Sequence, residues 1–230
     1  MSKKRIGIAV MALGMFLWAA AAYASPEAPR LLSPPMALPV PSGTFFVHLV
    51  LVNVLLGSVI LSVIDRRASA SDRKGGVAFM PKVLALAVNF GVAPFLFLQV
   101  LYGHFLYPSI VLMAVWWMFV ALFAMLAYYG LYVSDGAVRP ARRTPILFLS
   151  ALLLLMTAFL LSNASTLMLR PDFWFRWFSE PHGHLLNTSD PTLFPRYLHI
   201  LLASLAVGGL TMAWRAPWSK RDPEVDREEA

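Results

Sequence analysis

The sequence contains no cysteine and few charged residues. The absence of cysteine excludes disulfides, thiolate metal sites, iron–sulfur clusters and covalently attached c-type haem, which needs a C-x-x-C-H motif. Charged residues make up 13% of the 230 residues and hydrophobic residues 59%, so the chain lacks the polar surface that a soluble domain of this length needs. The formal net charge is +7, but the basic residues form no stripe interleaved with aromatics, and we expect no nucleic-acid partner.

Charged residues are also missing from the middle of every long apolar run. Five runs are long enough to cross about 30 Å of hydrocarbon, which takes roughly 20 helical residues. They lie near Thr44–Ile64, Pro81–Tyr102, Pro108–Val133, Pro145–Thr166 and Thr192–Trp214, and the prolines that begin three of them are expected at helix starts. Intramembrane charge is the usual mark of ion and proton pathways, so its absence argues against a pump, an ion-coupled transporter or a proton channel. The sequence predicts an all-α membrane protein with a five-transmembrane-helix bundle over residues 44–214.

The two ends of the chain and its loops indicate the orientation. Residues 1–24 are typical of a cleaved signal peptide, with an uncleaved anchor helix as the alternative, and residues 25–43 form a proline-rich periplasmic lead-in. Twelve basic residues fall in the predicted inner loops and tail, against three in the outer loops. We therefore expect the bacterial inner membrane, with the N-terminus outside and residues 215–230 as a cytoplasmic tail.

All five histidines lie on the predicted periplasmic half. His48 is about one turn into the first span, His104 is at the outer end of the second, and His199 is about two turns into the fifth. A neutral imidazole in an apolar zone needs a hydrogen bond or a metal. A bond between helices would account for one such residue, but three of them in a bundle without thiols or carboxylates favour haem iron. His182 and His184 lie in the outer loop, where two solvated side chains are a simpler interpretation than a surface metal site.

Two features of the fifth span suit a flat, anionic cofactor. Arg196 lies three residues before His199 on the same helical face, where it could pair with a haem propionate or, equally well, contact a lipid headgroup. Four small residues would permit close approach of a helix or a cofactor, namely Ala203, Ala206, Gly208 and Gly209.

Four segments, in this order, resemble helices of subunit I of cytochrome bd oxidase. Phe45–Ser58 (FFVHLVLVNVLLGS) is similar to its first helix and Val88–Pro94 (VNFGVAP) to its second. Leu161–Trp174 (LSNASTLMLRPDFW) resembles the end of its fourth helix, and Asp190–Leu210 (DPTLFPRYLHILLASLAVGGL) resembles its fifth. The resemblance covers about residues 44–214 and indicates a shortened, N-terminal-half-like member of this superfamily.

The resemblance implies haem b, one or two per chain. His199 would match the axial ligand of a low-spin b haem, with His104 or a partner's methionine opposite it, and His48 would match the ligand of a high-spin haem. The second half of the oxidase subunit has no counterpart here, so we do not expect oxygen reduction by this chain alone. The hypothesis is a respiratory subunit that passes electrons between the quinone pool and periplasmic, multihaem c-type cytochromes, completed by a second membrane subunit.

Two other interpretations stay open. Arg196–Leu210 also resembles the histidine helix of copper-resistance membrane proteins, which would imply metal transport. Alternatively, the protein is a redox-silent anchor or assembly subunit, and its histidines only form hydrogen bonds between helices.

Overall fold

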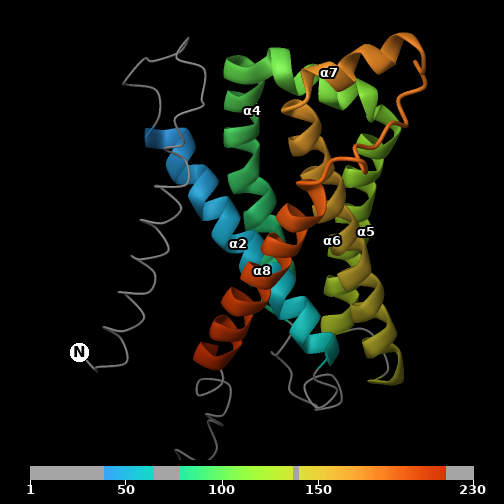
Figure 1. The fold of residues 1–230 in the computed structure, drawn as a ribbon. Coiled ribbons are helices and arrows are strands. Elements are labelled where there is room, and N and C mark those ends of the chain that lie inside the picture. Colours follow the sequence, from blue (N-terminus) through green and yellow to red (C-terminus); the bar gives the residue numbers. More distant parts are fainter. Residues whose placement is uncertain (1–38, 65–77, 137–139, 216–230) are drawn as a thin grey trace, which may run out of the picture. The chain divides into compact units, whose positions relative to one another are not determined.

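The computed structural model describes residues 39–64, 78–136 and 140–215 (Figure 1). The predicted signal peptide, most of the lead-in and the tail beyond residue 215 lie outside these ranges. All regular structure in the described ranges is helical, and they contain no strand. This agrees with the expected all-α fold.

Five of the helices are long and apolar enough to cross a membrane. They are α2 (Pro39–Ile64), α4 (Met80–Leu112), α5 (Ala114–Gly136), α6 (Pro140–Met168) and α8 (Leu193–Arg215). A short helix α7 (Pro171–Trp174) and a 3-10 turn η1 (Phe175–Phe178) lie between α6 and α8. Because hydrocarbon offers no hydrogen bonds, a helix is how an apolar run satisfies its own backbone groups there. The prediction of five membrane-spanning helices is confirmed.

The bounds of the second and third spans differ from the expected ones. The expected turn at residues 103–108 is helical, but α4 consists of two helical pieces that meet in a kink at the non-helical Tyr102 (φ −126, ψ 23), where the second span was expected to end. Pro108 lies inside α4 instead of starting the third span, which begins at Ala114. Lipid-buried helices accept an internal proline when other groups compensate for the lost hydrogen bond. The chain therefore breaks at Tyr102, the expected end of the second span, and again at Met113, and the segment between them is helical and not the predicted turn.

Of the other two prolines expected at helix starts, one is there and one is not. Pro81 lies in the first turn of α4, as predicted. Pro145 lies inside α6, because that helix begins five residues earlier at Pro140. Helix α2 begins at Pro39, so the last residues of the predicted lead-in are helical, and its candidate membrane span, Gly43–Ile64, agrees with the expected one.

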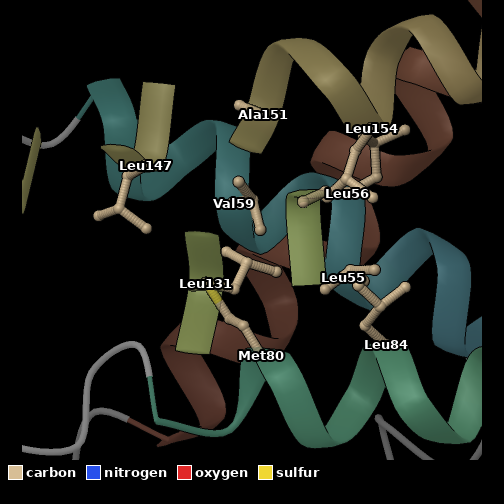
Figure 2. Packing of buried hydrophobic residues seen from close by; sticks show 10 residues of the cluster. Leu55, Leu56, Val59, Met80, Leu84, Leu131, Leu147, Ala151 and Leu154 are labelled. Atoms are coloured by element: carbon tan, nitrogen blue, oxygen red, sulfur yellow. The ribbon is translucent and has the colours of Figure 1, made fainter. Parts of the chain in front are cut away.

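Helix α2 is the central element, because it packs against α4, α6 and α8. Apolar side chains from α2, α4, α5 and α6 meet in one buried cluster (Figure 2). Its members are Leu55, Leu56, Val59, Met80, Leu84, Ala127, Leu131, Leu147, Ala151 and Leu154. The lipid-facing sides of the helices remain exposed and apolar, as a membrane environment allows.

Helices α2 and α8 cross at backbone distance, and Figure 1 shows the crossing near the middle of both helices. A Cβ atom built on Gly57 would overlap the backbone carbonyl oxygen of Ser204. One built on Gly208 would lie 2.6 Å from the Gly57 Cα. Ser204 also donates a hydrogen bond to the Asn53 Oδ1 atom at 2.8 Å. The expectation that small residues of the last span allow close helix approach is thus met at Gly208.

The connections at residues 103–113 and 169–192 lie at one end of the helices, which we call the loop end (Figure 1). A second apolar cluster holds them together, formed by Leu112, Met113, Leu160, Ala164, Leu167, Phe173 and Leu185. The connection then turns back along α6, because the backbone N–H of Asn187 donates to the Asn163 Oδ1 atom at 3.1 Å. Since Asn163 precedes the end of α6 by five residues, α8 begins below the rim of the bundle.

Candidate functional site

His48 lies half-buried on α2 and forms a hydrogen bond to the backbone of α4. Its Nδ1 atom is 2.7 Å from the carbonyl oxygen of Ala87. A carbonyl oxygen only accepts, so Nδ1 must carry the hydrogen and donate it. In the neutral ring the lone pair is then on Nε2, the atom through which a histidine so oriented binds a metal. The ring has the tautomer that an axial ligand needs.

Two neighbours fix the plane of the His48 ring. On α4, a Cβ atom at Gly91 would lie 2.7 Å from both Cε1 and Nδ1 of the ring, so only glycine leaves room for it. On α2, the Phe45 ring stacks against it at 6.4 Å between centroids and 20° between planes. The same arrangement also suits the interpretation in which His48 only joins two helices.

His199 and Arg196 lie on an exposed face of α8. Tyr197 lies on the opposite side, where its hydroxyl donates to the Leu155 carbonyl of α6 at 3.1 Å. Around His199 the exposed side chains are apolar, with Leu198 55% and Leu202 58% exposed. The expected placement of arginine and histidine on one exposed face of α8 is therefore present.

His104 is exposed and lies two residues beyond the bend in α4. Its ring is 4.1 Å from that of its neighbour Phe105, measured between centroids. His104 therefore lies just beyond the kink that ends the first helical piece of α4, close to the predicted outer end of the second span.

The three span histidines do not form one cluster. Within residues 39–64, 78–136 and 140–215, no group of three or more His, Asp or Glu side chains is placed to hold a metal ion. A haem iron needs only one or two such ligands, so the residues fit it as separate sites. His48 would supply one iron ligand between α2 and α4, and His199 another on the exposed face of α8, with Arg196 one turn away for a propionate. The opposite axial ligand of each iron would come from another group.

A buried polar network at the loop end was not anticipated. The side-chain amide of Asn187 donates to Thr166 Oγ1 at 3.3 Å and to Asp190 Oδ2 at 3.2 Å. Asp190 Oδ1 in turn accepts from the backbone N–H of Thr192 at 2.7 Å and from its hydroxyl at 2.6 Å. The sequence signal was an asparagine inside an apolar run, Asn163, followed by a second one in the loop.

The network controls the charge of Asp190 and the start of α8. The pKa of Asp190 is lowered mainly by the hydrogen bond from the Thr192 hydroxyl. The Thr192 N–H, the Asn187 amide and the Arg170 guanidinium lower it further, whereas desolvation raises it. Arg170 lies 3.9 Å from Asp190 and forms a closer pair with Asp172 at 2.8 Å. The ionised carboxylate thus binds the backbone N–H and the hydroxyl of Thr192, the residue immediately before α8, and helps to fix where that helix begins.

Comparison of the chain with protein-family models, with curated proteins and with solved structures finds no match. The resemblance to the oxidase subunit therefore stays a prediction from the sequence, and the chain is described by its fold as a five-helix, multi-pass membrane protein.

Proposed function

We propose that this chain is a b-haem-binding membrane subunit of a respiratory complex. The observation that supports it most is the geometry of His48, whose Nδ1 donates to the Ala87 carbonyl and whose Nε2 keeps its lone pair. His48 would hold one iron and His199 a second, while Arg196 would neutralise a propionate. The bound haem would supply one-electron transfer, and the protein fixes its ligands and the polarity around it.

The position of α8 supports completion by a second membrane subunit. Among the described helices, α8 packs mainly against α2, and its Arg196, Leu198 and Leu202 side chains are exposed. The guanidinium of Arg196 on an exposed helix face is a group that hydrocarbon tails disfavour. Contact with a cofactor propionate and a partner helix on this face would remove it from lipid.

The loop end would face the periplasm. This orientation follows from the basic residues in the sequence, which favour the other end for the cytoplasm. Both proposed ligands lie toward the loop end of their helices, so electrons would pass between the quinone pool in the membrane and c-type cytochromes in the periplasm. The hydrogen bond of His48 equally suits the anchor role, in which this histidine only joins α2 and α4, so haem content must decide between the two.

The test is the haem content of the complex isolated from native membranes through an affinity tag without histidine. We expect the absorption spectrum of b haem, with iron equivalent to one or two haems per chain. His48→Ala and His199→Ala should each remove or shift a distinct component of the reduced spectrum. Val50→Ala and Leu210→Ala, which change exposed residues of the same two helices, should leave it unchanged. A colourless complex would overturn the proposal. So would histidine variants whose spectra are both identical to that of the unaltered complex.

A second variant tests the ring geometry without removing the ligand. Gly91→Ala would place a methyl group against the His48 ring and displace it from the Ala87 carbonyl. We expect a shifted haem spectrum in a complex of normal composition. Gly209→Ala is the control, because its Cβ would make only an ordinary contact, 3.6 Å from Leu61 Cδ1. An unchanged spectrum in Gly91→Ala would exclude His48 as a ligand held by this hydrogen bond.

A further inference from the structure

The tripeptide 182–184 is bound to the break between α4 and α5. The backbone N–H of Val115 donates to the Gly183 carbonyl at 2.9 Å, and the Trp116 indole donates to the His184 carbonyl at 2.8 Å. The next residue, Leu185, donates its N–H to the carbonyl of Leu112 at 3.0 Å. Three hydrogen bonds within three consecutive residues hold this stretch of loop in one conformation.

Glycine is required at the centre of the tripeptide. Gly183 has φ +67, a left-handed conformation that residues with a Cβ rarely adopt. A Cβ here would also lie 3.1 Å from the Cβ of Ala114. Gly183 itself is buried, whereas the histidines on both sides of it are exposed. The backbone is thus anchored while the two side chains project from it.

The two imidazoles lie side by side. Their ring centroids are 5.8 Å apart and their planes differ by 13°. With the backbone held, only the χ angles of two exposed side chains need to change for one nitrogen of each ring to reach a common ion at about 2.0–2.1 Å. Much of the ordering that a chelating pair requires is therefore already provided by the fold.

We propose that His182 and His184 form a surface site for a divalent transition-metal ion, with Cu2+ bound most tightly. Imidazole nitrogen suits Cu2+, Ni2+ and Zn2+, and their affinities follow the order in which Cu2+ is highest. No third His, Asp or Glu joins the pair in the part of the chain that the structure describes, so water completes the coordination and the ion stays accessible. The site is separate from the proposed haem ligands and does not depend on them.

The test is titration of the purified, metal-stripped protein with Cu2+, carrying a tag without histidine. Quenching of tryptophan fluorescence reports binding near Trp116, and the electron paramagnetic resonance spectrum reports nitrogen ligands. We expect one site in the unaltered protein and a loss of more than about tenfold in affinity in His182→Asn and in His184→Asn, since even indirect ligand partners contribute that much. Thr188→Ala, an exposed change in the same loop, should bind as the unaltered protein does.

Gly183→Ala distinguishes a preorganised metal site from two surface histidines that act independently. It keeps both imidazoles but strains the backbone that holds them, and we expect weaker copper binding with a modest loss in melting temperature and unchanged helical circular dichroism. The proposal would be overturned if the variant with both histidines replaced bound copper as tightly as the unaltered protein. So would full affinity in Gly183→Ala, because the anchored backbone would then contribute nothing.

Discussion

The crossing of α2 and α8 and the polar network at the loop end position the same helix by opposite means. At the crossing, Gly57 and Gly208 bring two backbones together, and the contact depends on the absence of side chains. At the loop end, Asn187 and Asp190 hold the start of α8 through directional hydrogen bonds. The crossing has no room for an added side-chain atom, whereas the polar network has no replacement for a lost hydrogen-bond partner.

The difference follows from the surroundings of each contact. In a membrane, apolar surface gains little by packing against protein instead of lipid, so close approach of small residues becomes the main attraction between helices. Near the rim, a non-helical connection must satisfy its backbone groups within the protein, and buried amide and carboxylate side chains provide the partners. Substitutions at the two contacts should therefore fail for different reasons.

The largest effect is expected from Gly57→Ala. Its methyl group would overlap the Ser204 carbonyl oxygen, and both atoms belong to helices that cannot yield locally. We expect a loss of about 3 kcal/mol in the free energy of unfolding, at the upper end for an overpacked core. Thermal unfolding followed by circular dichroism in detergent measures it. Gly43→Ala is the control, because a Cβ there meets nothing within 4 Å, and equal melting of the two variants would contradict a tight crossing.

Asn187→Ala should have the next largest effect. The substitution removes the amide that donates to Thr166 and Asp190 and leaves both acceptors buried without that partner. We expect a loss of about 2 kcal/mol, measured in the same unfolding experiment. Replacement of its exposed neighbour in Thr188→Ala should cost almost nothing. If the two variants unfold alike, the network does not hold the connection.

Asp190→Asn tests the polar network through the pH dependence of the melting temperature. Because the folded-state pKa of Asp190 is lowered, its stabilising effect is complete above the unfolded-state value of about 3.9 and disappears as the pH falls through the folded value. Near neutral pH we expect the variant to be about 1 kcal/mol less stable, as for loss of a helix cap. Melting temperatures recorded at decreasing pH should converge below about pH 4. A difference that does not change with pH would mean that the charge is irrelevant.

The smallest effect is expected from Asp172→Asn. Asp172 pairs with Arg170 at 2.8 Å, but its side chain is 67% exposed, and water and salt screen such a pair. We expect no measurable change in melting temperature at physiological ionic strength. A loss as large as that in Asp190→Asn would show that the exposed pair, and not the buried network, anchors the loop.

The sequence predicts the five spans well, because apolar length is a property of each segment alone. It fails at Pro108 and Pro145, since a proline that could start a helix can also lie within one when the surroundings compensate. For the site, sequence spacing places Arg196 and His199 on one face, which the structure has. It could not pair His48 with Ala87 or Asn163 with Asn187, because these contacts depend on how separate helices pack.

The crossing of α2 and α8 has a consequence for biosynthesis. The first described span meets the last one at Gly57, with most of the other described residues made in between. While the ribosome is still synthesising the intervening helices, Gly57 of α2 does not yet have its partner helix. This crossing can therefore form only after residues 193–215 have entered the membrane, late in synthesis.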